Sequence, residues 1–199
     1  PYKLASNVVR MGCGNEFIVY QTADNKVYAM GESSTWNAGM NLTTATPTEL
    51  QYRKDSRPKN FDFRAKKIDG GEKFCIIQSE AGDIYITGNV ASNDQGSTTT
   101  YEGFTYNAQL SERRIQDFSC SWSSVCFLDF AGNMFSLAKI CQDEKQVTPT
   151  AHLTKMPMIC AGAGFFLMVA QDTLAVFRMN SDGVSLDAIT STVKYDTTG

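Results

Sequence analysis

The chain has 199 residues, of which 42% are hydrophobic and 11% aromatic, which is enough for one sizeable core and too much for a disordered chain. Its 18 basic and 21 acidic residues give a net charge of -3, which argues against a dedicated nucleic-acid binder. No run approaches the roughly 18 consecutive apolar residues of a membrane-spanning helix, so we predict no membrane span.

A block of sequence near the N-terminus is repeated further along the chain. Residues 11–31 are MGCGNEFIVYQTADNKVYAMG, and residues 68–88 are IDGGEKFCIIQSEAGDIYITG. The two copies align without a gap, so that Tyr28, for example, falls on Tyr85, which lies 57 positions later. Such self-similarity at a fixed spacing indicates a repeat protein.

Each copy has the composition of a β-hairpin bounded by glycines. The pairs at 24–25 (DN) and 81–82 (AG) stand where a tight turn would join two strand-like runs. Glycine-bounded polar loops of equal length follow at 31–39 and 88–96, and Trp36 in the first loop is a candidate partner-binding residue. Because an isolated hairpin is only marginally stable, the repeats must bury their faces against further strands.

The segment 52–67 is an insertion relative to the other junctions between repeats, and it is strongly basic. Seven Lys or Arg residues are offset there only by Asp55 and Asp62. Two interpretations are open: a solvated surface loop, or a docking site for an acidic protein surface, a phospholipid head group or a phosphate backbone. The candidate contact residues in this segment are Arg53, Lys54, Arg57 and Lys59.

Two further repeats follow in weaker form. The third aligns with the second at an offset of 50 and carries Trp122 beside its degenerate glycine pair. We expect Trp122 to pack against a neighbouring repeat, with ligand or partner stacking as the alternative. The fourth begins with the GAG of residues 162–164, has an apolar run at 165–170 and contains another hairpin turn at Asp182-Gly183. The approximate repeats are 8–50, 65–110, 114–153 and 158–195.

The apolar runs of the four repeats predict strands that are covered on both faces. Successive residues in these runs are all apolar, whereas a sheet with one wet face would alternate apolar and polar residues. Small antiparallel sheets stacked face to face around an axis, as in a β-propeller, produce that pattern in their inner strands. We therefore predict an all-β fold with strands at 17–20 and 74–77.

The six cysteines form no CxxC pair and no cluster with histidine, so we predict no zinc site and no other metal. Cys75 and Cys126 lie within apolar runs, which predicts buried free thiols and a reducing compartment. The single histidine, His152, falls between repeats with no acid assigned to it by spacing. No nucleotide-binding or hydrolase motif is present, and we predict no catalytic residues and no cofactor.

The sequence resembles the regulator of chromosome condensation repeat family, whose units fold as blades of a β-propeller. The resemblance rests on Gly14 before an apolar strand, a turn with Asp and Asn, Tyr28 on the return strand, a glycine-bounded loop and Pro47 before the next repeat. It spans about residues 8–177. Two family positions differ. The Trp usually found before the last glycine of the hairpin is Met30 and Thr87 in the two copies, and the His that commonly follows the glycine pair is Phe17 and Phe74.

This resemblance implies a single, partial β-propeller domain over residues 1–199. Propellers of this family usually have seven blades, and the chain supplies about four. An open arc would leave strand edges exposed, so we expect the remaining blades to come from further residues or from another chain. The chain begins at Pro1 without an initiator Met, which also leads us to expect an excerpt.

The resemblance also implies a function. The commonest use of the family is a non-enzymatic propeller whose loops bind protein partners, and this is our first hypothesis. The alternatives are promotion of nucleotide exchange on a small GTPase, for which no wedge residues can be assigned, and a module of a larger signalling protein or ubiquitin ligase. Nucleic acid is expected only as a ligand of the basic segment, and the location is expected to be intracellular, either cytoplasmic or nuclear.

Overall fold

The computed structural model describes residues 5–91, 98–122, 125–131, 134–136, 158–162, 165–170, 173–179, 186–188 and 193–194. These residues form β-sheets with one short helix, and the chain divides into two compact units. The first unit is 1–90 with 99–112, and the second is 91–98 with 113–199. Predictions that concern Cys141, His152 and the turn at 182–183 lie outside the described residues.

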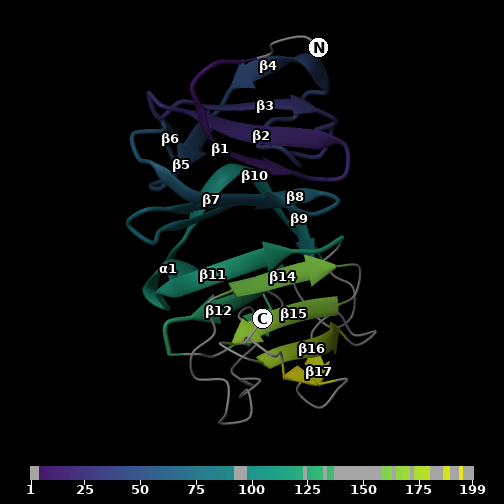
Figure 1. The fold of residues 1–199 in the computed structure, drawn as a ribbon. Coiled ribbons are helices and arrows are strands. Elements are labelled where there is room, and N and C mark those ends of the chain that lie inside the picture. The colour runs from purple at the N-terminus through teal and green to yellow at the C-terminus, as the bar shows by residue number, and fades with distance from the viewer. Residues whose placement is uncertain are drawn as a thin grey trace. The chain divides into compact units, whose positions relative to one another are not determined.

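The first sheet of the first unit is an antiparallel meander whose strands lie in chain order (Figure 1). The hairpin turn falls where the sequence predicts it, with Asn25 at φ 67° and the Thr22 N–H donating to the Lys26 carbonyl at 3.0 Å. Asparagine tolerates this left-handed conformation better than most residues. The strands are β1 (Val8–Cys13), β2 (Phe17–Thr22), β3 (Val27–Gly31) and β4 (Thr44–Glu49).

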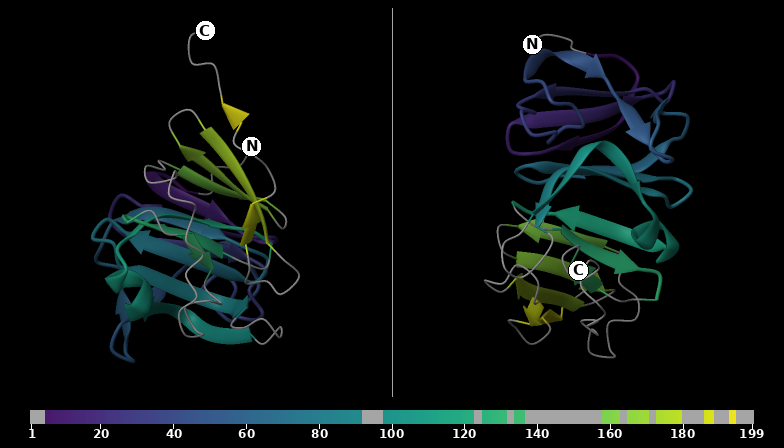
Figure 2. Two further views of the ribbon diagram at one scale, coloured as in Figure 1. Left: turned by 90° about the horizontal axis from the view of Figure 1, so that it is seen from below. Right: turned by 180° about the vertical axis from the view of Figure 1, so that it is seen from behind.

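The second sheet of the first unit has six strands in the order β6-β5-β10-β9-β8-β7. Its longest strand, β10, is curved and leads into the short helix α1 (Figure 2). No helix in the described part of the chain is long and apolar enough to cross a membrane. The elements are β5 (Gln51–Arg53), β6 (Pro58–Asn60), β7 (Ala65–Gly70), β8 (Phe74–Ser79), β9 (Ile84–Ala91), β10 (Thr98–Asn107) and α1 (Ala108–Glu112).

The second unit also contains two sheets, ordered β11-β12-β13 and β14-β15-β16-β17, with β18 paired to β16. Two side chains of β11 accept hydrogen bonds from backbone N–H groups of β14. Ser119 Oγ accepts from Ala161 N at 2.9 Å, and Asp117 Oδ2 accepts from Ile159 N at 3.3 Å. The strands are β11 (Ile115–Cys120), β12 (Val125–Asp129), β13 (Met134–Ser136), β14 (Met158–Gly162), β15 (Phe165–Ala170), β16 (Thr173–Met179), β17 (Leu186–Ala188) and β18 (Val193–Lys194).

One backbone hydrogen bond recurs in three of the sheets at the spacing that the sequence predicts. In each case the backbone N–H of the residue directly after the sheet's second strand donates to the carbonyl of the residue directly before its first strand, 16 positions earlier. The offsets between copies are again 57 and 50 residues, which supports the alignment of the degenerate third repeat. The bonds are Ala23 N–H to Asn7 C=O (2.9 Å), Glu80 N–H to Arg64 C=O (2.9 Å) and Phe130 N–H to Arg114 C=O (3.2 Å).

Glycines at equivalent places allow the first strands of the two sheets of the first unit to approach each other. A Cβ atom added at Gly12 of β1 would lie 2.6 Å from the carbonyl oxygen of Ile68 in β7. A Cβ atom added at Gly70 of β7 would lie 2.9 Å from the carbonyl oxygen of Cys13. Both distances are too short for real atoms, so the close stacking of these sheets requires glycine at both positions.

The core of the first unit lies between its two sheets. Val19 and Ala29 of the first sheet are fully buried, as are Ile77 and Tyr85 of the second. The prediction of strands covered on both faces is confirmed for β8 and β12, in which every residue is buried. It is only partly correct for β2, where Ile18 is half-buried.

A buried glutamine joins the first sheet to the start of the second. Gln21 of β2 has no exposed surface, and its Oε1 accepts a hydrogen bond from Ala65 N at 2.7 Å. Its Nε2 donates to the carbonyl of Phe63 at 2.8 Å and to that of Asn25 at 3.1 Å. The amide thereby satisfies backbone groups where β7 begins, which would otherwise be buried without a partner.

We expect Gln21→Leu to lower the free energy of unfolding by about 1–3 kcal/mol, because the buried Ala65 N–H loses its acceptor. Gln51→Leu is the matched control, since Gln51 is exposed and its side chain bonds to Asn60 Oδ1 at 2.9 Å on the surface, and it should change stability by less than about 0.5 kcal/mol. Urea denaturation measures both. Equal effects of the two substitutions would contradict the role of Gln21.

Candidate functional site

The basic insertion folds as a β-hairpin added to the second sheet, although a surface loop was one expectation from the sequence. β5 pairs antiparallel with β6, so that Arg53 lies opposite Pro58. β5 also runs parallel to β10, with Tyr52 beside Phe104. The chain enters the hairpin directly from β4 of the first sheet through Leu50, which is buried. Strand pairing on one side therefore holds the hairpin in place.

An aromatic cluster anchors the hairpin to the second sheet. Tyr52 is buried, and its ring centroid lies 5.3 Å from those of Phe61 and Phe63 and 5.0 Å from that of Tyr85. Phe63 stacks on Tyr85 at 4.7 Å. Edge-to-face and stacked pairs of this kind add to the stabilisation from burial alone. Burial raises the pKa of the Tyr85 hydroxyl, which therefore stays neutral.

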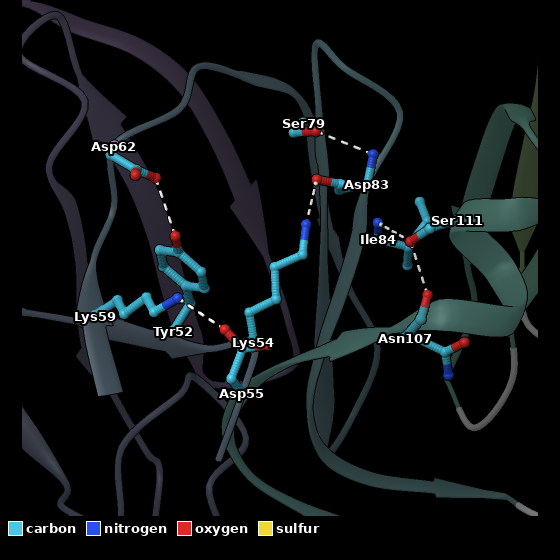
Figure 3. A network of polar contacts seen from close by, with 10 residues as sticks. All are labelled: Tyr52, Lys54, Asp55, Lys59, Asp62, Ser79, Asp83, Ile84, Asn107 and Ser111. Atoms are coloured by element: carbon cyan, nitrogen blue, oxygen red, sulfur yellow. Dashed lines mark hydrogen bonds and ion pairs between the residues drawn. The ribbon is translucent and has the colours of Figure 1, made fainter. Parts of the chain in front are cut away.

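Polar contacts fix the hairpin at its turn (Figure 3). Tyr52 Oη donates to Asp62 Oδ1 at 3.0 Å, and burial followed by this hydrogen bond raises the pKa of Tyr52. Lys54 Nζ lies 3.3 Å from Asp83 Oδ2 and 4.3 Å from the centroid of the Tyr106 ring, a geometry that suits a cation–π contact. The hairpin is thus joined by side chains to the β8–β9 turn and to β10.

The helix α1 is joined to the second sheet next to this network (Figure 3). Ser111 Oγ accepts a hydrogen bond from Ile84 N at 2.9 Å and donates to the carbonyl of Asn107 at 2.7 Å. Asn107 Oδ1 accepts from Leu110 N at 3.0 Å and so acts as the N-cap of the helix. The surroundings of the hairpin are therefore ordered on two sides.

The cations of the insertion differ in whether they have a counter-charge. Arg53 and Arg57 are exposed, and among the described residues neither side chain forms a hydrogen bond or ion pair. Arginine in this state can offer its planar donor fork to a carboxylate or phosphate. Three other cations of this segment have acidic partners: Lys54–Asp83 at 3.3 Å, Lys59–Asp55 at 3.0 Å and Arg64–Glu80 at 3.7 Å.

A groove of about 550 Å³ lies beside the hairpin within the first unit. It brings together Trp36 and Arg53, two of the candidate residues from the sequence, and its walls also include Leu50 and Glu102. Lys54, Arg57 and Lys59 are on the same hairpin but do not line the groove. Glu102 was not predicted, because it lies 49 positions after Arg53 and only the pairing of β5 with β10 brings the two strands together.

Trp36 lies at one wall of the groove, where hydrogen bonds to its carbonyl fix its backbone. It adopts φ 65°, and its carbonyl accepts hydrogen bonds from Thr87 Oγ1 at 2.7 Å and from Gly39 N at 2.9 Å. A half-buried indole on a fixed backbone contributes contact area at low entropic cost. Trp122 lies in the second unit and is 55% exposed, which argues against the packing role that we expected for it.

The described cysteines do not provide a nucleophile near this groove. Cys75 and Cys126 are buried, as predicted, and burial raises the pKa of both thiols, which therefore stay protonated at neutral pH. Cys13 and Cys160 are free and exposed, and neither lines the groove. Within the described ranges, no three His, Cys, Asp or Glu side chains come together as metal ligands.

The chain consists of small antiparallel sheets, and its similarity to solved structures shows that the fold is a β-propeller of the regulator of chromosome condensation type. The chain is similar to human WBSCR16, with 16% identity and a TM-score of 0.68 over 88% of this chain and 48% of that one. It is also similar to Prp20p from Saccharomyces cerevisiae, whose structure was described with its binding properties to Gsp1p and histones; identity is 13% and the TM-score 0.67 over 98% of this chain and 52% of that one.

A third similar structure is that of Kap60 bound to yeast RCC1 (Prp20), with 15% identity and a TM-score of 0.61 over 90% of this chain and 45% of that one. The chain therefore spans about half the length of these structures. No protein-family model and no curated protein matches the sequence. At these identities the similarity establishes the fold, and functional residues must be argued from this chain itself.

Proposed function

We propose that this chain is a non-enzymatic propeller module that binds protein partners through the surface added by the β5–β6 hairpin. The observation that carries the proposal is the groove in which Trp36, with its fixed backbone, lies together with Arg53, whose guanidinium group has no polar partner among the described residues. Trp and Arg are the residue types most enriched where binding energy concentrates in protein interfaces. The ordered hairpin supports the proposal, because binding to it does not require the loss of conformational entropy that ordering a loop would cause.

The similar structures support protein binding as the general role. Prp20p was described with its binding to Gsp1p and histones, and yeast RCC1 was solved bound to Kap60. The free thiols of the described cysteines support the expected reducing, intracellular location. We extend none of those partners to this chain by name, since the residues that would recognise them are not defined by the fold.

We expect Arg53→Glu with Arg57→Glu to reduce the capture of protein partners by the immobilised full chain at least tenfold. The reason is that these two guanidinium groups have no counter-charge within the described part of the chain and can therefore pair across an interface. Quantitative mass spectrometry of the captured proteins is the measurement. The matched control is Arg64→Glu, a charge reversal in the same segment, which should leave capture unchanged. The side chain of Arg64 is 51% exposed and already forms an ion pair with Glu80. Unchanged capture by the double variant would rule out the hairpin surface.

A second candidate function is promotion of nucleotide exchange on a small GTPase, favoured by the description of Prp20p together with Gsp1p. In this case the chemistry belongs to the partner and the propeller only opens its nucleotide site. Release of a fluorescent nucleotide from a panel of purified small GTPases tests it. Acceleration by the chain at catalytic concentration is the expected result for an exchange factor, whereas stable binding without acceleration favours the binding module.

We also propose that a further blade covers the free face of the first sheet, supplied by additional residues or by another chain. Met11, Tyr20 and Tyr28 lie side by side on this face, opposite the one that meets the second sheet. In the second sheet the positions equivalent to Met11 and Tyr28 are Ile68 and Tyr85, and both are buried in the core between the two sheets. Met11 is 59% exposed, although Tyr20 on the same face is buried, so among the described residues Met11 lacks the cover that Ile68 has.

Substitutions at the equivalent positions Met11 and Ile68 test whether the face of the first sheet is uncovered in this chain. Met11→Gln should change the free energy of unfolding by less than about 0.5 kcal/mol, because Met11 is exposed. Ile68→Gln should cost about 1–3 kcal/mol, because it buries an amide without a partner in the core. Thermal or urea denaturation compares them. A cost at Met11 as large as that at Ile68 would mean that the face is already covered.

A further inference from the structure

We propose that the groove beside the β5–β6 hairpin binds an extended protein segment in which a single carboxylate lies next to an aromatic or large apolar side chain. This inference rests on the protein-binding function proposed above and names the chemistry of its ligand. The groove of about 550 Å³ is bounded by the β3–β4 loop, the end of β4, the hairpin and β10, all within the first unit. Each of these boundaries contributes a different feature to recognition.

The apolar part of the groove suits one large side chain. Met40 and Leu50 are buried and line the groove together with the half-buried Trp36. Gly39 and Gly103 also line the groove; a Cβ atom added at Gly39 would lie 2.8 Å from the ring of Phe104, so glycine there allows Phe104 to pack against the groove wall. An aromatic or branched apolar side chain placed against Trp36 would bury apolar area on both partners, with stacking added for an aromatic ring.

The cationic part of the groove is Arg53. Its guanidinium group has no polar partner among the described residues, although Lys54 and Lys59 on the same hairpin are both paired with acids. A carboxylate can accept two parallel hydrogen bonds from one guanidinium, and this geometry is shorter and stronger than neutral hydrogen bonding. The position of Arg53 in the same groove as Trp36 therefore places the acid of a ligand next to its apolar side chain.

The acidic lining residues limit the ligand to one negative charge. Glu49 is neutralised by Lys26, with Nζ and Oε2 separated by 3.5 Å. Glu102 is exposed in the groove and has no cationic partner among the described residues. A chain of phosphates would bring several negative charges close to Glu102, whereas a peptide with one carboxylate on Arg53 avoids this repulsion. A protein segment thus fits better than nucleic acid or a phosphoinositide surface.

The backbone of β6 favours an extended ligand. Its three residues are exposed, and among the described strands β6 pairs only with β5, so one side of its backbone has no strand partner. Extended peptides commonly bind by adding themselves to such an edge, with alternate side chains entering neighbouring pockets. Pro58 and Asn60 of this strand both line the groove, so the free edge and the groove are continuous. Pro58 has no backbone N–H, so at this position only its carbonyl can pair with a ligand.

Selection from a phage-displayed library of random octapeptides on the immobilised full chain tests the proposal. We expect enriched peptides that carry an Asp or Glu adjacent to an aromatic or large aliphatic residue. The Arg53→Gln variant should bind a selected peptide at least tenfold more weakly, as measured by fluorescence polarisation with the synthetic, labelled peptide. Arg64→Gln is the matched control, because Arg64 is an exposed arginine of the same segment that does not line the groove, and it should leave the affinity unchanged.

A second peptide with the acid replaced by its amide completes a double-mutant cycle. We expect this peptide to bind as weakly as the acidic peptide binds Arg53→Gln, with no further loss when both changes are combined. Selected peptides without an acid, or with affinities indifferent to Arg53, would overturn the inference while leaving protein binding intact. Stronger, Arg53-dependent binding of single-stranded DNA or of phosphoinositide vesicles would also overturn it. If no peptide is selected and no partner is captured, both proposals fail.

Discussion

The close approach of two backbones is the constraint on which the first unit depends. Strands β1 and β7 belong to different sheets, yet their main chains lie near enough that a methyl group at Gly12 would meet the Ile68 carbonyl at 2.6 Å. At this separation the side chains of the two facing surfaces interlock, and the core formed by Val19 and Ile77 becomes dry. A larger residue at Gly12 or Gly70 would push the sheets apart and open that core. The glycine pairs of the repeat are therefore part of the packing between sheets.

Sheets stacked face to face cannot extend one another's hydrogen-bond ladders. At the junctions between them, side chains therefore form hydrogen bonds with backbone groups of the next sheet. In the first unit Gln21 accepts from the Ala65 N–H, and in the second unit Ser119 accepts from the Ala161 N–H. Each bond satisfies a backbone donor of the incoming sheet with a side chain of the preceding one. The two units thus use different residue types, an amide in one and a hydroxyl in the other, for the same kind of contact.

The proposed binding surface depends on an addition to this architecture. Among the described residues the β5–β6 hairpin has no counterpart in the other repeats, and Tyr52, packed among Phe61, Phe63 and Tyr85, anchors it. Its lysines are neutralised by nearby acids, so the charge that remains available to a ligand resides on arginines. A rigid hairpin with unpaired guanidinium groups can contribute to binding without the entropic cost of ordering a loop. The same segment in a disordered state would offer only a diffuse positive charge.

The sequence by itself determined the repeat, the strands at 17–20 and 74–77, the turns between them and the all-β class, because these features follow from local periodicity and from glycine spacing. It also singled out Arg53 and Trp36. Only the tertiary structure decided that these two share a groove, that Glu102 joins them and that Trp122 is exposed. It alone showed that the basic insertion pairs with β10. The physical reason is that these contacts join residues distant in the sequence, 17 positions apart for Trp36 and Arg53 and 49 for Arg53 and Glu102. Their formation depends on which strand edges meet, and no local pattern encodes this.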